Sequence, residues 1–293
     1  MRVLVTGGTG FLGREFVRAA DAHGHSLAVL SRQERSFGGA NIRFLPGSLA
    51  EPPWKLIEAF APEACVHSAW IATPGVYLES PENEAWVDWS RGFIGRLAQC
   101  GLRHATVLGT CIEYQITGDK LHEVATPLAP VSRYARSKVR LFQELAAMPA
   151  TSPISLAWAR IFYPYGEGEH PARLASSLVA KMAAGESVFL KTPRSIKDYI
   201  HSEDVGRALL KIMESQVVGA VNVGTGEGVM IESLARKIAD LLGRPELIQT
   251  PAQPVSDPLD FVVADASKLL GLGWKPQVEL DEGLRRLVEA RRR

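Results

Sequence analysis

The sequence has few cysteines and no long hydrophobic run, and each absence excludes a class of protein. Its three cysteines, Cys65, Cys100 and Cys111, are an odd number without a Cys-x-x-Cys pair, which argues against a disulfide framework and a zinc site. No segment approaches the roughly 18 uncharged apolar residues of a membrane span, and the first residues show no signal-peptide pattern. We therefore predict a cytoplasmic protein with no bound metal and no membrane partner.

The sequence also lacks a net charge of either sign. Lys and Arg total 33 and Asp and Glu total 32, so the formal net charge is +1. Such a balance produces no overall field that would recruit nucleic acid, so no nucleic acid partner is expected. Any anionic ligand must be held by a local group of charges.

What is present is an ordinary globular composition in a chain of 293 residues, long enough for about two domains. The first part of the chain alternates short apolar runs with longer amphipathic stretches, which predicts parallel strands with helices on both faces. We expect an α/β protein with a Rossmann-type doubly wound parallel sheet. The predicted strands are residues 2–5, 27–30, 42–44, 65–67, 105–108 and 154–160, and the predicted helices are residues 11–22, 82–100 and 132–148.

A glycine-rich turn directly follows the first predicted strand. Its glycines satisfy the pattern Gly-x-Gly-x-x-Gly within residues 6–13. Glycines here allow a tight turn, a close approach of a pyrophosphate to bare backbone, and helix amides that face the phosphates. A glycine turn without a ligand is the alternative, but the strand-turn-helix context favours dinucleotide binding. The predicted contacts are Gly7, Thr9, Gly10, Phe11, Leu12 and Gly13.

The end of the second strand indicates which dinucleotide is bound. A carboxylate there would accept hydrogen bonds from the ribose, whereas an arginine accommodates a 2'-phosphate. The sequence reads Leu30, Ser31, Arg32, with Arg35 as a further donor. We therefore predict NADP(H) in preference to NAD(H), which remains possible. The alternative is that Arg32 is only a surface residue.

Tyr134 and Lys138 lie four residues apart near the start of a predicted helix, which places the phenol and the ammonium on one face. A free tyrosine has a pKa of about 10, and a neighbouring cation lowers it. We predict that Lys138 acidifies Tyr134, so that the phenol can exchange protons. Taken alone, this spacing also fits a plain amphipathic helix.

The composition of the sequence changes after Tyr163, where prolines and glycines become frequent. We predict a dinucleotide-binding Rossmann domain over residues 1–163 and a smaller α/β substrate-binding region over residues 164–293, and we leave open a return of the chain to the sheet. Apolar residues at spacings of three and four predict two helices in the second region. They are Val205, Ala208, Leu209 and Ile212 in one helix and Ile231, Leu234, Ala235 and Ile238 in the other.

Five segments together carry a family resemblance. Residues 6–13, TGGTGFLG, look like TGxxGxxG; residues 67–70, HSAW, look like HxAA; and residues 109–114, GTCIEY, look like SSxxxYG. Residues 160–166, RIFYPYG, look like RxxNxYG, and residues 197–205, KDYIHSEDV, look like RDYIHxxDV. With the Tyr134 and Lys138 pair, the chain resembles the extended short-chain dehydrogenase/reductase family, in particular its sugar-nucleotide epimerases, dehydratases and reductases.

The resemblance implies specific roles. Thr110 is expected to hydrogen-bond the reacting sugar oxygen, Tyr134 to act as general acid or base, and Lys138 to bind the nicotinamide ribose. Further cofactor contacts implied in this way are Ser48, Leu49, Ser68, Ala69, Trp70 and Phe162. The implied substrate contacts are Thr73, Thr110, Cys111, Ile112, Tyr163, Arg173 and Lys197. The resemblance also implies a homodimer.

The sequence departs from this family where substrate is bound. Dehydratases carry Thr-Asp-Glu where this chain has Thr110, Cys111 and Ile112, so dehydration is disfavoured unless Glu113, one position later, turns toward the site. Tyr163 replaces an asparagine and Lys197 an arginine. Residues 254–257 lack the arginine that holds the diphosphate. The substitutes considered are Arg173, Lys191 and Arg194.

The leading hypothesis is NADPH-dependent reduction of a 4-keto-deoxysugar attached to a nucleotide, because a preference for NADP suits net reduction. Two alternatives stay open. One is a nucleotide-sugar 4-epimerase with tightly bound NAD, and the other is a protein that senses a dinucleotide without catalysis.

Overall fold

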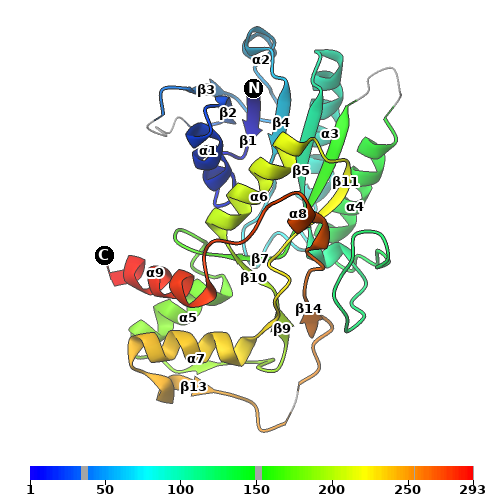
Figure 1. The fold of residues 1–293 in the computed structure, drawn as a ribbon. Helices are drawn as coiled ribbons and strands as arrows, with labels where there is room; N and C mark the ends of the chain where they lie inside the picture. The colour runs from blue at the N-terminus through cyan, green and yellow to red at the C-terminus, as the bar shows by residue number, and fades with distance from the viewer. Residues whose placement is uncertain (34–38, 149–153, 254, 293) are drawn as a thin grey trace.

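The structure, a computed structural model, describes residues 1–33, 39–148, 154–253 and 255–292. Its centre is a seven-stranded sheet in which every pair of neighbours is parallel (Figure 1). The spatial order is β11-β6-β5-β4-β1-β2-β3. The strands are β1 (Arg2–Thr6), β2 (Ser26–Ser31), β3 (Ile42–Pro46), β4 (Ala64–His67), β5 (His104–Thr110), β6 (Ser155–Ile161) and β11 (Gly219–Val223). The predicted fold class and the six predicted strands are confirmed.

Helices cover both faces of this sheet. On one face, α1 (Gly13–Ala22) packs beside α6 (Ser202–Ser215), and their apolar side chains share a core with β1, β2 and β6. On the other face lie α2 (Trp54–Phe60), α3 (Glu82–Gln99) and α4 (Arg133–Ala146), which enclose a second core. The three helices predicted in this part are α1, α3 and α4. The first begins two residues later than predicted, since residues 11 and 12 belong to the turn.

Part of the chain after residue 163 forms a smaller body below the sheet, in which α5 (Leu174–Ala183), α7 (Ile231–Leu242) and α9 (Leu280–Arg292) pack together (Figure 1). The two amphipathic helices predicted here are α6 and α7. The remaining elements are η1 (Cys111–Glu113), β7 (Tyr163–Tyr165), β8 (Val188–Phe189), β9 (Ile196–Lys197), β10 (Tyr199–His201), β12 (Val229–Met230), η2 (Pro245–Leu247), β13 (Ile248–Gln249), β14 (Phe261–Val262) and α8 (Ser267–Gly271).

The chain returns to the main sheet after residue 163, because β11 pairs with β6 and α6 packs on α1. The division into two regions at residue 163 remains a prediction. No helix among the described residues combines the length and the apolar character needed to cross a bilayer.

The strand order places a topological switch point between β1 and β4. β2 and β3 continue the sheet from one side of β1, whereas β4, β5 and β6 continue it from the other. In doubly wound sheets the crevice at this point, beyond the carboxyl ends of the strands, is where ligands bind. The residues that follow β1 and β4 are therefore expected to line a ligand-binding crevice.

Candidate active site

The turn after β1 depends on its glycines. Gly7 has a φ of 67°, and a Cβ there would lie 2.6 Å from the backbone nitrogen of Ala69. A Cβ on Gly13 would overlap the carbonyl oxygen of Gly7, so helix α1 can start this close to the strand only with glycine. A Cβ on Gly10, by contrast, would meet only the Gly7 oxygen, at 3.2 Å. The turn therefore presents bare backbone at the switch point.

Two cavities adjoin at this turn and share Gly7, Gly10, Ala69 and Trp70. The first, of about 650 Å³, extends along β2 and β3 and is called the Arg32 cavity. The second, of about 330 Å³, extends over β5 and α4 and is called the Tyr134 cavity.

Most of the predicted site residues line one of these cavities. Besides the shared residues, those on the Arg32 cavity are Thr9, Ser31, Arg32, Ser48 and Leu49. Those on the Tyr134 cavity are Phe11, Leu12, Ser68, Thr110, Cys111, Ile112, Tyr134, Lys138, Phe162, Tyr163 and Arg173. Gly13, Thr73 and Lys197 do not line either cavity. Gly13 lies beneath the turn, and Thr73 is exposed on the loop that precedes α3. Arg35 lies outside the described residues.

The three predicted catalytic side chains meet in the Tyr134 cavity because β5 ends there and α4 begins there. Thr110 is the last residue of β5, and Tyr134 lies in the first turn of α4, where Ser132 caps the helix by accepting from the Ala135 amide. The next turn of α4 brings in Lys138, whose Nζ lies 5.8 Å from the centre of the Tyr134 ring and donates to the Leu108 carbonyl at 2.8 Å.

The predicted lowering of the Tyr134 pKa is wrong for this structure. Burial raises the pKa of the Tyr134 phenol well above its ordinary range, and Tyr77, whose ring packs edge-on at 4.9 Å, adds to the rise. Burial also lowers the pKa of Lys138 to about 7. Arg173 opposes the rise at Tyr134, because its guanidinium favours the phenolate. Sequence spacing correctly placed the two groups on one helix face, but it contained no information on how far burial would disfavour their charged forms.

Glu113 turns away from the cavity into the core. Its carboxylate is fully buried, where Arg160 donates to it at 2.7 Å and Trp158 donates from the indole nitrogen at 3.0 Å. The backbone amide of Thr110 also donates to it, at 2.8 Å. The carboxylate is therefore a structural anchor for the end of β5, and it supplies no acid to the Tyr134 cavity.

Lys197, which replaces the family's arginine, is separated from the Tyr134 cavity. It is buried, its Nζ lies 3.3 Å from Asp257, and it faces the ring of Tyr163 at 5.7 Å. Tyr163 itself lines the cavity, whereas Lys197 does not. Arg173 does line the cavity, with its guanidinium 5.4 Å from the centre of the Tyr77 ring.

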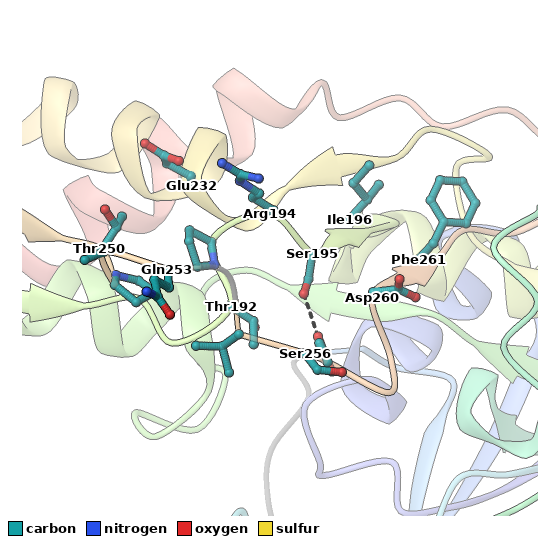
Figure 2. A pocket seen from close by; sticks show the side chains of 15 residues that line it. Thr192, Arg194, Ser195, Ile196, Glu232, Thr250, Gln253, Ser256, Asp260 and Phe261 are labelled. Carbon is teal, nitrogen blue, oxygen red and sulfur yellow. Dashed lines mark hydrogen bonds between the residues drawn. The ribbon is translucent and has the colours of Figure 1, made fainter.

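A third cavity, of about 450 Å³, lies in the smaller body and shares no lining residue with the other two (Figure 2). Arg194 and Asp257 line it, together with Val255 and Ser256 from the segment predicted to resemble a diphosphate site. Pro254 of that segment lies outside the described residues, and Lys191 lines none of the three cavities. We place the chemistry in the Tyr134 cavity because it holds the glycine turn and the Tyr134 and Lys138 pair.

The sequence analysis missed Tyr77 and His170, both of which line the Tyr134 cavity. They come from loops without a periodic pattern, and nothing local marked them as site residues. Among the described residues no three His, Cys, Asp or Glu side chains are grouped so that they could hold a metal ion.

Comparison with known proteins identifies a common family. A model of the NAD dependent epimerase/dehydratase family matches residues 3–224. The UDP-glucose 4-epimerase of Corynebacterium glutamicum is 24% identical over 99% of this chain and 94% of its own length. The dTDP-4-dehydro-6-deoxy-D-allose reductase of Streptomyces bikiniensis is 28% identical over 87% of this chain and 86% of its own length.

Solved structures agree with this result. The UDP-glucose 4-epimerase of Thermus thermophilus, solved in complex with NAD, is 28% identical and superimposes with a TM-score of 0.86. That alignment covers 100% of this chain and 99% of the other.

Proposed function

Because this chain belongs to the NAD dependent epimerase/dehydratase family, we propose that it reduces a nucleotide-linked 4-keto-deoxysugar with NADPH. One observation carries the proposal: Thr110, Tyr134 and Lys138 line the same cavity as Gly7 and Gly10 of the glycine turn. A proton-transfer group and a dinucleotide cradle are thereby brought together.

The described residues fit a bound dinucleotide. The turn from Gly7 to Gly13 leaves bare backbone that a pyrophosphate can approach, and α1 begins there without a side-chain cap from any described residue. The adenosine part would extend along the Arg32 cavity, where Arg32 and Ser31 can donate to a 2'-phosphate. When bound, the dinucleotide supplies the hydride. NAD is the cofactor named in the solved relative, so the preference for NADP depends on Arg32.

The raised pKa of Tyr134 suits the reductive direction. At neutral pH the phenol keeps its proton, and it can donate that proton to the carbonyl oxygen as hydride arrives at the carbon. Thr110 can donate a hydrogen bond to the same oxygen and stabilise the charge that develops on it. Tyr134 then regains a proton from solvent, and the product is an alcohol.

Elimination of water would need an acid beside Thr110. Cys111 and Ile112 occupy the positions where dehydratases carry acids, and Glu113 is paired with Arg160 in the core. These contacts support a reaction that ends with proton transfer to the carbonyl oxygen of the sugar, without loss of water.

The Tyr134 cavity also suits an anionic substrate. Of the described residues that line it, none is acidic, whereas Lys138 and Arg173 are basic. Arg173 lies on the substrate side, beside Tyr77, and its guanidinium can hold a phosphate in two hydrogen bonds. We therefore assign Arg173, rather than the enclosed Lys197, to the substrate phosphate.

A second candidate is a nucleotide-sugar 4-epimerase with retained NAD, and the two epimerase relatives favour it. The decisive experiment incubates the purified protein with NADPH and a dTDP- or UDP-linked 4-keto-6-deoxyhexose and follows the near-ultraviolet absorbance of NADPH. We expect net consumption that matches the alcohol formed, and its loss in Tyr134→Phe. Interconversion of UDP-glucose and UDP-galactose without net cofactor consumption would instead establish the epimerase. Binding of a dinucleotide with neither reaction would favour a sensor.

A further inference from the structure

Trp70 occupies the position where the resembled HxAA segment has alanine, and it lines both cavities at the switch point. Its indole is fixed in place. The indole nitrogen donates to the side-chain oxygen of Asn83 at 2.8 Å, and the Asn83 amide donates in turn to the carbonyls of Tyr77 and Ser80. Asn83 is fully buried, so rotation of the indole would leave buried polar groups without partners.

The face of this indole meets the Lys138 side chain. Nζ lies 3.8 Å from the ring centre, and it also donates to the Leu108 carbonyl. Only 3% of Lys138 is exposed, and no carboxylate in the described part of the chain lies within ion-pair distance of it. The indole face and one carbonyl thus take the place of the counter-ion that a buried ammonium normally requires.

We propose that Trp70 is a positioning residue that holds Lys138 as an ammonium at the wall of the Tyr134 cavity. The part of the inference that concerns the dinucleotide rests on the proposed function. An ammonium makes a charge-assisted hydrogen bond to a ribose hydroxyl, which is stronger than the bond from a neutral amine. An indole that stabilises the charged form would therefore strengthen dinucleotide binding through Lys138.

The Lys138 ammonium has a pKa near neutral pH, and the ionisable groups around it are considered in turn. Burial lowers its pKa to about 7, so a modest stabilisation of the ammonium changes its population strongly. On the same helix Tyr134 stays protonated, since burial raises the pKa of its phenol. From β4, His67 stays neutral, because burial and the Lys138 charge lower its pKa to about 3.

Two further ionisable groups, Cys111 and Glu113, lie in η1 just beyond the end of β5. Burial raises the pKa of the Cys111 thiol to about 12, so it stays neutral. Glu113 favours the ammonium from a distance while it is held by Arg160. Burial raises the pKa of the Glu113 carboxyl above its usual range, and the Arg160 guanidinium opposes this rise.

The first test measures the pKa of Lys138 in the protein without added nucleotide, from the pH dependence of the ε-carbon NMR signal. That signal is assigned by its loss in Lys138→Gln. Because a tryptophan face binds cations better than phenylalanine and leucine has no such face, we expect the pKa to fall in the order wild type, Trp70→Phe, Trp70→Leu, by about one unit overall. Trp89→Leu, at an exposed residue that packs on Trp86, is the matched control and should leave the pKa unchanged.

The second test titrates the same variants with NADP⁺ and NAD⁺ across pH. For Trp70→Leu we expect about five-fold weaker binding at roughly pH 7 and recovery to within about two-fold of wild type at roughly pH 5.5, as the ammonium reforms.

Even if Trp70→Leu fails to fold, Trp70→Phe must show a smaller shift in the same direction. An unchanged Lys138 pKa, or binding weakened equally at every pH, would overturn the inference. A wild-type protein that binds neither nucleotide would refute the proposed function, whereas the pKa comparison would still decide the contact between Trp70 and Lys138.

Discussion

Arg32 lies just beyond the end of β2, where Ser31 Oγ donates to the Gln33 carbonyl and so shapes the turn. Replacement by Ala should weaken NADP⁺ binding by about 10- to 100-fold, since one charge-assisted contact to phosphate is lost. NAD⁺ binding should change by less than about two-fold, because NAD⁺ has no 2'-phosphate. Calorimetric titration with both nucleotides provides the measurement, and Arg91→Ala, at an exposed position of α3, is the control. An equal loss for both nucleotides would remove the basis for an NADP preference.

Glu113 is buried without exposure to solvent and is paired with Arg160. Glu113→Gln leaves the guanidinium buried with no carboxylate, and such a broken pair costs about 3–5 kcal/mol of folding free energy. Urea unfolding should detect this loss. The exposed pair of Glu58 and Arg96 offers a comparison, and Glu58→Gln should cost less than about 1 kcal/mol. Equal stability of the two variants would show that the buried pair contributes no more than a surface pair.

Most of the residues predicted from the sequence line one of the two cavities, but the charge states of Tyr134 and Lys138 could not be predicted. The spacing of Tyr134 and Lys138 predicted one shared helix face, and both line the same cavity. Their pKa values are shifted mainly by burial, and the groups in contact with them, Tyr77, Trp70 and the end of β5, come from distant parts of the chain. For the same reason the sequence left the direction of Glu113 open.

At the scale of elements, the contact between α1 and α6 depends on Gly206. A Cβ at this residue would lie 2.5 Å from the backbone carbonyl carbon of Glu15, which cannot yield without moving α1. Gly206→Ala should therefore destabilise the protein by about 1–3 kcal/mol, as overpacking does. Since α1 begins at the glycine turn, dinucleotide binding should weaken as well. Thermal unfolding and a nucleotide titration measure the two effects.

Gly92 in α3 is the matched control for this substitution. A Cβ there meets no atom within 4 Å, and the residue is exposed on the helix. Gly92→Ala should stabilise the protein by about 0.5–1 kcal/mol, because alanine loses less conformational freedom in a helix. Stabilisation by both substitutions would contradict the close contact between α1 and α6.

Elements with strong patterns were predictable, and short ones were not. Apart from the edge strand β3, the predicted strands of the sheet are mainly buried along their length, and α6 and α7 carry a clear apolar stripe. β8, β9, β12, β13 and β14 contain two residues each, too few for any periodicity. The pairing of such strands depends on how the surrounding segments pack against one another.

At the scale of the whole molecule, Glu167 joins the C-terminal helix α9 to the rest. His201 donates to its carboxylate from Nε2 at 3.0 Å, Arg286 of α9 donates at 2.8 Å, and Arg14 of α1 donates to its carbonyl. The hydrogen bond from His201 is the largest of the causes that lower the pKa of Glu167 to about 2, and a backbone hydrogen bond and the one from Arg286 contribute to the same shift. The ionised carboxylate is thus preferred in the folded protein.

The resulting stability is present above the pKa of an unfolded glutamate, about 4.5, and is lost as the pH falls toward 2. Glu167→Gln should be less stable than wild type near neutral pH, and this difference should disappear over that acidic interval. Thermal unfolding against pH tests the expectation, with Glu282→Gln on the exposed side of α9 as control. A difference that stays constant at every pH would show that ionisation of Glu167 does not stabilise the fold.

The family and the fold class follow from the sequence alone, and both expectations are confirmed, the first by the family match over residues 3–224. The cytoplasmic location and the homodimer remain predictions. Local patterns are sufficient for the family and the fold class, because an apolar run or a glycine turn indicates its local structure within a few residues. The tertiary structure alone decided that Glu113 faces the core, that Lys197 packs on Tyr163 and does not line the cavity, and that Trp70 covers Lys138. Each of these depends on burial among segments distant in the chain, and burial determines which charges a site can use.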